Sequence, residues 1–202
     1  MIIGITGGTG CGKTTALQVF SHLGGTVIDC DAVYHQLLQA DKGLLCAIDT
    51  RFPGVVKEGV LDRKALGAVV FSNTDALAEL NRITHAAVIK EVQKRLTAPG
   101  HIAIDAIALL ESGLGALCDV TVAVTAPAEM RIQRIMARDS ISEDYARQRI
   151  AAQKSESYFR TNCDHILENN GTETEFHAKC LAFFKGLGIM EEESFPIKED
   201  IV

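Results

Sequence analysis

Residues 7–14, with the sequence GGTGCGKT, follow a pattern of one glycine, any four residues, a second glycine, a lysine and then a serine or threonine. Glycines let backbone N–H groups turn toward a phosphate and let its oxygen atoms come close. A helix that begins directly after such a loop adds the positive end of its dipole. Lys13 is then expected to reach the outer phosphates, and the Thr14 hydroxyl to hold Mg2+. The pattern predicts a loop that binds a polyphosphate.

The residues around this loop support the prediction. Residues 1–6, MIIGIT, are a short apolar run of the kind that forms a buried parallel strand. Residues 14–20 begin a helical pattern that places Leu17 and Phe20 on one face. The alternative is a glycine-rich turn that precedes a lysine by chance, and the order of strand, glycine loop and helix disfavours it.

The composition narrows the class of protein. The 202 residues are 47% hydrophobic, which suits one α/β domain with small insertions. The net charge is −6 and no block of lysine and arginine occurs, so nucleic acid is not expected as a partner. The six cysteines form no CxxC pair, which favours reduced thiols in a cytoplasmic protein over a zinc or redox motif. No signal peptide or membrane-spanning run is recognisable, so no membrane association is expected.

Hydrophobic runs alternate with helical patterns along most of the chain. Further strands are expected at residues 25–29, 101–105, 119–124 and 165–169. Helices are expected at residues 34–38, 44–48, 63–71, 74–96 and 176–187, with helix starts near residues 73 and 142. The long helical stretch from residue 32 to 96 is interpreted as an insertion beside the sheet. The predicted fold class is α/β, with a doubly wound parallel sheet and the phosphate loop after its first strand.

Three acidic residues follow predicted strands, at the edge where such sheets bind ligands. In a phosphoryl-transfer enzyme, Asp29 or Asp31 could accept the proton of the acceptor hydroxyl or orient that hydroxyl. Asp31 is the better candidate because it lies farther from the strand end. Asp105 is a candidate for holding a metal-bound water. Each of these acids could instead be a helix or turn cap, so both interpretations stay open.

Three arginines, Arg131, Arg134 and Arg138, can share one face of a helix. Arginines on a mobile segment can close over phosphates and exclude water. A solvent-exposed basic face is the simpler interpretation for most of them, and only Arg138, at the expected end of the helix, is singled out. His85, taken alone on a helix, is interpreted as structural.

These features occur in the order found in the dephospho-coenzyme A kinase family, which the chain resembles from about residue 1 to 185. The matching segments are 5–15, 28–31, 59–63, 70–71, 83–85, 105–111 and 118–139, followed by Gln153 and residues 164–169. Enzymes of that family use ATP to phosphorylate the ribose 3′-hydroxyl of dephospho-coenzyme A, the last step of coenzyme A synthesis. The resemblance implies ATP and dephospho-coenzyme A as substrates and Mg2+ as the metal ion.

The resemblance also implies roles for individual residues. Asp31 would contact and activate the ribose hydroxyl, while Lys13 and Arg138 would stabilise the transferring phosphoryl group. The nucleotide would be bound by Gly8, Thr9, Gly10, Cys11, Gly12, Lys13, Thr14 and Thr15, with Thr14 also binding Mg2+. Asp31 would bind the acceptor. The acceptor side of the site would be lined or supported by Thr6, Asp29, Arg63, His85, Asp105 and Glu111.

The family architecture implies three parts. A nucleotide-binding core is expected from residues 1–31, 98–137 and 161–188. A helical insertion at 32–97 would bind the coenzyme A moiety, and residues 138–160 would form a lid. Residues 189–202 are expected to be a flexible acidic tail, and the protein to be a monomer or a weak homo-oligomer.

The chain departs from the family pattern at three places. Ala86 and the pair Ile107-Ala108 stand where the family often has proline, and Arg131 stands where it often has glutamine. Proline shapes the backbone more than the chemistry, so local differences in the acceptor pocket are expected. A kinase for a nucleotide, shikimate or gluconate would share the loop but is not expected to carry the helical insertion. A guanine-nucleotide switch would show an Asn-Lys-x-Asp signal, which this chain lacks.

Overall fold

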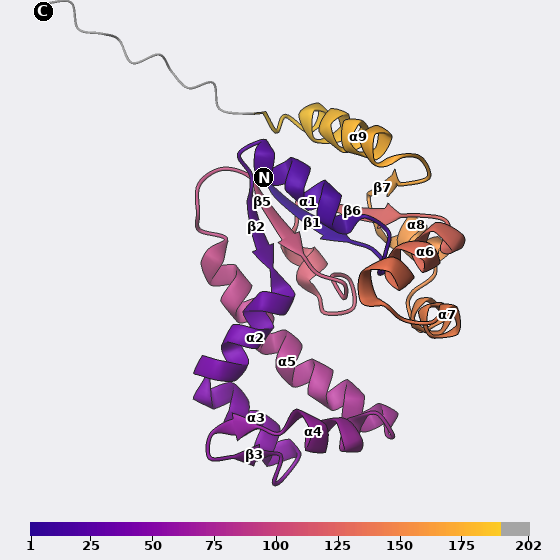
Figure 1. The fold of residues 1–202 in the computed structure, drawn as a ribbon. Helices are drawn as coiled ribbons and strands as arrows, with labels where there is room; N and C mark the ends of the chain where they lie inside the picture. The colour runs from indigo at the N-terminus through magenta and orange to yellow at the C-terminus, as the bar shows by residue number, and fades with distance from the viewer. Residues whose placement is uncertain (191–202) are drawn as a thin grey trace, which may run out of the picture.

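A five-stranded parallel sheet forms the centre of the computed structural model, which describes residues 1–190 (Figure 1). The strands lie in the order β2–β5–β1–β6–β7, and every neighbouring pair is parallel. Their bounds are Ile2–Thr6 for β1, Thr26–Asp29 for β2, Ile102–Asp105 for β5, Val120–Thr125 for β6 and His165–Glu168 for β7. The five strands and the parallel sheet predicted from the sequence are therefore confirmed.

Helices cover both faces of this sheet. They are α1 (Lys13–His22), α2 (Cys30–Ala40), α3 (Lys42–Arg51), α4 (Arg63–Val70), α5 (Thr74–Arg95), α6 (Ala128–Asp139), α7 (Glu143–Ala151), α8 (Glu156–Asn162) and α9 (Glu173–Gly186), with a short 3-10 helix at Leu114–Leu117. On one face α1 and α9 pack together, and the rings of Phe20 and Phe184 meet edge to face with centroids 5.4 Å apart. On the other face, Val33 of α2 and Val88 of α5 are buried against the sheet. This burial on both faces holds the strand ends rigidly in place.

Helices α2 to α5 form an arm that extends away from the sheet, at the bottom of Figure 1. The arm has its own apolar cluster, in which Leu45, Ile48, Phe52 and Val70 are buried. The helices expected in this stretch are thus confirmed. A small antiparallel hairpin, β3 (Val56–Lys57) with β4 (Val60–Leu61), was not expected.

Three helices begin earlier than the apolar pattern predicts, and capping explains each start. The Asp29 side chain caps α2, which begins at residue 30 rather than 34. Asp41 caps α3 in the same way, and this helix begins at residue 42 rather than 44. Thr172 and Glu175 form a capping box before α9, so this helix begins at residue 173 rather than 176. The starts expected near residues 73 and 142 are confirmed, since Asn73 and Ser142 are N-caps.

The segment α6–α8 connects β6 to β7. Helices α6 and α7 share a small apolar cluster of Ile132, Ile135 and Ala146, and α8 was not expected. Toward the end of the chain Ile189 is fully buried, so the core still includes the first residue of the expected tail. The remainder of that tail, from residue 191, lies outside the described residues. Within residues 1–190, no helix combines the length and apolarity needed to cross a membrane.

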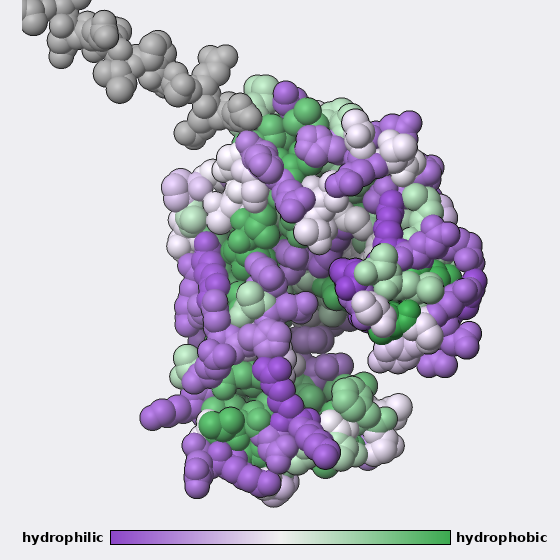
Figure 2. Space-filling view, in the orientation of Figure 1, coloured by the Kyte–Doolittle hydropathy of each residue, from purple (hydrophilic) through white to green (hydrophobic). Residues whose placement is uncertain are grey.

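The strand order places the arm and the α6–α8 segment on opposite halves of the sheet. The arm leaves after β2 and returns before β5, while the α6–α8 segment leaves after β6 and returns before β7. The glycine loop follows β1, which is the central strand. Figure 2 shows that the surface is hollowed between the arm and the α6–α8 segment. The loop therefore lies between two projecting parts of the molecule.

Candidate active site

The glycine loop joins β1 to α1 in a conformation that excludes side chains at two positions. Gly12 has a φ of +100°, and a β-carbon there would lie 2.2 Å from the side-chain nitrogen of Asn169. Gly7 has a φ of +143°, and a β-carbon there would lie 2.4 Å from the carbonyl oxygen of Val124. The backbone then enters α1 at Lys13, so the first N–H groups of the helix lie at the mouth of the loop.

The Lys13 ammonium forms an ion pair with Asp105 at the end of β5. Both side chains are only 17% exposed. Burial raises the pKa of the Asp105 carboxyl, and the charge of Lys13 opposes this rise. Asp29 is the register partner of Asp105 on the neighbouring strand, so these two strand-end acids lie side by side. The lysine of the loop and the acids of the sheet edge thus meet at one place.

Asp29 and Asp31 have different surroundings although they are two residues apart. The Asp29 carboxylate accepts hydrogen bonds from the N–H groups of Asp31 at 2.9 Å and Ala32 at 3.0 Å. The helix-cap interpretation that stayed open for these acids therefore holds for Asp29. The Asp31 side chain is exposed and forms no hydrogen bond with residues 1–190, which leaves its carboxylate available to a ligand.

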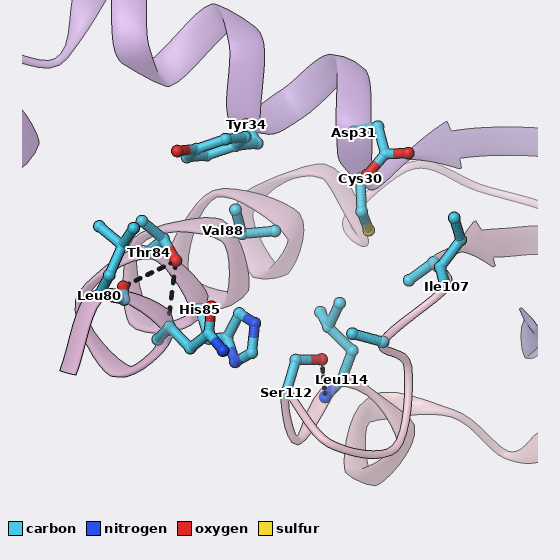
Figure 3. A pocket seen from close by; sticks show the side chains of 13 residues that line it. Cys30, Asp31, Tyr34, Leu80, Thr84, His85, Val88, Ile107, Ser112 and Leu114 are labelled. Atoms are coloured by element: carbon cyan, nitrogen blue, oxygen red, sulfur yellow. Dashed lines mark hydrogen bonds between the residues drawn. The ribbon is translucent and has the colours of Figure 1, made fainter. Parts of the chain in front are cut away.

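A pocket of about 220 Å³ opens beside Asp31, between α2, α5 and the loop after β5 (Figure 3). Asp31 and Tyr34 lie on one side of it, with Thr84 and His85 across from them. Ile107 contributes to the lining from the loop after β5. Apolar walls with a few polar groups are typical of sites for organic molecules.

Three predicted acceptor residues lie in or near this pocket, namely His85, Glu111 and Arg63. Burial lowers the pKa of the His85 imidazole, and the carboxylate of Glu111 opposes that shift. The ring is therefore neutral at pH 7 and can both donate and accept a hydrogen bond. The charge of Arg63 similarly opposes the rise that burial causes in the pKa of Tyr34. Sequence reasoning alone took His85 to be structural, whereas the structure places it on the pocket wall.

Thr6 does not reach the pocket. Its side chain is fully buried at the end of β1, and its hydroxyl donates a hydrogen bond to the carbonyl oxygen of Ile107 at 3.0 Å. Since Ile107 lines the pocket, Thr6 supports the acceptor side through the loop after β5.

Arg131 and Arg134 of α6 lie against the glycine loop. Arg131 Nε donates to the carbonyl oxygen of Thr9 at 2.9 Å, and Arg134 Nη1 donates to that of Gly10 at 3.3 Å. The interpretation of these two arginines as solvent-exposed is therefore wrong. Spacing along α6 could not reveal the contact, because it depends on how the helix crosses the loop.

Arg138, the arginine singled out from the sequence, lies farther along α6. Its guanidinium pairs with Asp139, with Nε 2.7 Å from Oδ1, and its side chain is 59% exposed. Arg149 pairs with the same carboxylate at 2.5 Å. The structure gives Arg138 no contact with the glycine loop.

Two side chains that contact the loop received no role from the sequence. Gln153 accepts a hydrogen bond from the Thr9 N–H at 3.0 Å and donates one to the Thr9 hydroxyl at 2.7 Å. Asn169 donates one to the carbonyl oxygen of Cys11 at 2.9 Å. For Asn169 a signal was present, because it directly follows β7, whose carboxyl end shares an edge with the loop.

The glycine loop has the groups needed to bind a polyphosphate together with a metal ion that the phosphates coordinate. Within residues 1–190 the N–H groups of Gly10 and Gly12 donate to no acceptor, and the Thr14 hydroxyl forms no hydrogen bond. The same residues contain no cluster of three or more histidine, cysteine or acidic side chains that could hold a metal. A hydroxyl combined with phosphate oxygens and waters is a ligand set that Mg2+ accepts.

The sheet, the glycine loop and the adjoining pocket define a P-loop kinase. A similar fold occurs in the shikimate kinase of Bacteroides thetaiotaomicron, with a TM-score of 0.55 at 14% identity over 93% of this chain and 98% of that one. The dephospho-CoA kinase of Campylobacter jejuni has a TM-score of 0.59 at 23% identity over 95% of this chain and 98% of that one. TT1252 from Thermus thermophilus is more similar, with a TM-score of 0.79 at 31% identity over 93% and 97%.

Sequence comparison identifies the family. The family model described as dephospho-CoA kinase matches residues 1–175. The dephospho-CoA kinase of Latilactobacillus sakei is 34% identical over 192 residues, which cover 92% of this chain and 95% of that protein. That of Anaeromyxobacter dehalogenans is 37% identical over 177 residues, or 84% of each chain. The chain belongs to the dephospho-CoA kinase family, and the family resemblance found in the sequence is confirmed.

Proposed function

We propose that this chain transfers the γ-phosphoryl group of ATP to the ribose 3′-hydroxyl of dephospho-coenzyme A, which gives coenzyme A and ADP. Membership of the family makes it an ATP-dependent kinase. The observation that supports this acceptor is the free carboxylate of Asp31, which lies on the wall of a pocket that can hold an organic molecule. This pocket is at the same edge of the sheet as the glycine loop. A carboxylate in this position can accept or orient the proton of an attacking hydroxyl.

In the proposed reaction, the 3′-oxygen forms a bond to the γ-phosphorus while the bond from that phosphorus to the β–γ bridging oxygen breaks. Asp31 accepts the hydroxyl proton, and ADP leaves with the electron pair of the broken bond. The loop N–H groups and Lys13 bind the phosphates, and the Thr14 hydroxyl would help to hold Mg2+. Bound Mg2+ would neutralise charge on the phosphate oxygens during transfer.

The remaining predicted site residues take supporting roles in this proposal. Arg138 would have to leave Asp139 and turn toward the phosphates, which fits a role for residues 138–160 as a lid that closes. The arm would hold the coenzyme A moiety, with His85 and Arg63 near the Asp31 pocket. Asp105 would keep Lys13 in place before the nucleotide binds.

The test is ADP release by the purified protein with ATP, Mg2+ and dephospho-coenzyme A, together with the mass of the product. We expect one added phosphate on the acceptor and a fall in kcat of about 10²- to 10⁴-fold in Asp31→Asn. Asp41→Asn is the matched control, because Asp41 caps α3 in the arm and lines no part of the Asp31 pocket. Full turnover in Asp31→Asn would remove the acid–base role, and no phosphorylation of dephospho-coenzyme A would refute the proposed acceptor.

A further inference from the structure

Three successive carbonyl groups of the glycine loop are each held by a side chain from outside the loop. Thr9 and Gly10 accept hydrogen bonds from Arg131 and Arg134, as described above. The third carbonyl, that of Cys11, accepts from Asn169 Nδ2 at 2.9 Å. The contacts come from α6 and from the end of β7, so elements far apart in the sequence hold one short stretch of backbone.

Because the peptide bond is planar, the contact at the Cys11 carbonyl also sets the direction of the Gly12 N–H. In a planar trans peptide the C=O of one residue and the N–H of the next point in opposite directions. The Cys11 carbonyl points to Asn169, so the N–H of Gly12 points away from Asn169. The Gly12 N–H donates to no acceptor within the described residues. Asn169 thereby aims a free donor at the place where a phosphate would bind.

Asn169 is itself held firmly and in one orientation. Its side chain is 4% exposed, and its backbone N–H donates to the carbonyl oxygen of Thr125 at 2.7 Å. Its Oδ1 accepts from Arg134 at 3.3 Å, which leaves Nδ2 facing the Cys11 carbonyl. An amide satisfies both neighbours at once, because one requires an acceptor and the other a donor.

The same side chain explains why residue 12 must be glycine. A β-carbon on Gly12 would lie 2.2 Å from Asn169 Nδ2, so the amide occupies the space that any larger residue would need. The contact thus fixes both the direction of the Cys11–Gly12 peptide and its distance from β7.

We infer that Asn169 is a positioning residue for phosphate binding, which holds the Gly12 N–H in the direction required by the phosphates of ATP. The inference rests on the proposed function insofar as ATP is the ligand. Asn169 acts through the loop and is assigned no contact with the nucleotide.

The experiment compares Asn169→Asp and Asn169→Ala with the wild-type protein. Asn169→Asp keeps the shape but turns an acceptor oxygen toward the Cys11 carbonyl, while Asn169→Ala removes the contact. We expect the Kd for MgADP, measured by calorimetry, to rise about tenfold or more, since the lost bond fixes a phosphate donor. The KM for dephospho-coenzyme A should stay within about twofold, because the acceptor pocket lies elsewhere.

A structural role alone would give a different pattern. Thr121→Val is the matched control, because Thr121 is also buried on the sheet and hydrogen-bonded, to Asp164, away from the loop. It should lower Tm while leaving MgADP affinity unchanged. In the wild type the Gly12 amide resonance should shift when MgADP binds, and this shift should shrink in both Asn169 variants.

Two results separate this inference from the proposed function. Asn169 variants that bind MgADP as tightly as the wild type, with only a lowered Tm, would overturn the inference. A wild-type protein that binds MgADP through Gly12 but phosphorylates no dephospho-coenzyme A would refute the proposed function and leave the role of Asn169 intact.

Discussion

Lys13 pairs with a carboxylate that a nucleotide would have to replace. Its ammonium forms an ion pair with the Asp105 carboxylate, and both side chains are largely buried. Because burial raises the pKa of the Asp105 carboxyl, its charged form depends on a nearby cation. When Lys13 turns to a phosphate, Asp105 requires another positive partner. The role considered for Asp105 from its place in the sequence, holding a metal-bound water, would meet that requirement.

Cys11 lies inside the phosphate loop, yet we expect it to resist thiol reagents. Its side chain is 1% exposed, and burial raises the pKa of the thiol. The thiolate is the reactive form, so between about pH 7 and pH 9 Cys11 holds less of it than an ordinary cysteine. Iodoacetamide should modify the exposed Cys46 and leave both Cys11 and MgADP affinity unchanged, as peptide mass spectrometry and calorimetry would show. Modification of Cys11 in the native protein would contradict this expectation.

Residue roles were predictable where a motif carried them and unpredictable where the fold created the contact. The GxxxxGKT pattern predicts roles for Lys13 and Thr14, because the pattern encodes a local backbone shape. Arg131 looked like one more charged residue on a helix, and its contact with Thr9 depends on the crossing of α6 over the loop. Asn169 likewise lies 158 positions from the carbonyl that it holds. Such contacts follow from the tertiary arrangement, which no local pattern encodes.

At the scale of elements, the first turn of α2 carries Asp31, and the cap of this helix fixes its direction. Asp29 accepts hydrogen bonds from two N–H groups of that turn, including the N–H of Asp31 itself. We expect Asp29→Ala to lower the free energy of unfolding by about 1 kcal/mol. We also expect kcat to fall about tenfold or more, because Asp31 loses its fixed position. Urea denaturation and the ADP-release assay measure the two effects.

Asp41→Ala separates the two effects. Asp41 accepts from the N–H groups of Gly43 and Leu44, so its loss removes a cap of the same kind from α3. It should cost a similar amount of stability and leave kcat unchanged. Equal losses of kcat in Asp29→Ala and Asp41→Ala would show that the cap of α2 has no particular link to Asp31.

The elements themselves were mostly predictable, with errors at their ends and in the arm. All five strands of the parallel sheet followed from apolar, β-branched runs. Helix starts were placed too late at α2 and α9, which an aspartate cap and a threonine cap begin four and three residues before the expected starts. The hairpin of β3 and β4 was missed because two-residue strands are too short to show alternation.

At the scale of the whole molecule, the sheet holds the phosphate loop between two parts that have separate cores. The arm is stabilised by its own apolar cluster, while the α6–α8 segment has only a small cluster between α6 and α7. An element with few buried apolar contacts opens at a lower free energy than the core does. The α6–α8 segment is therefore the part of the molecule that we expect to move most readily.

Gln153 ties this segment to the loop by two hydrogen bonds to Thr9, at 3.0 and 2.7 Å. Arg131, which stands where the family often has glutamine, donates to the same Gln153 oxygen and to Thr9. We expect Gln153→Ala to speed amide hydrogen exchange in α7 about fivefold, since a net loss of about 1 kcal/mol lowers the cost of opening. Exchange in β1, which requires global unfolding, should speed up by no more than the same factor, because global unfolding breaks the same hydrogen bonds.

Gln148→Ala is the matched control for this prediction, because Gln148 is exposed on α7 and its side chain forms no hydrogen bond with residues 1–190. The same exchange rates in the two variants would show that Gln153 does not restrain the segment. Faster exchange in Gln153→Ala alone would show that the phosphate loop and the segment are mechanically linked. MgADP should then slow exchange in α7 of the wild type more than in Gln153→Ala, because a loop fixed by phosphates restrains α7 partly through Gln153 and partly through the contacts of α6 with the loop.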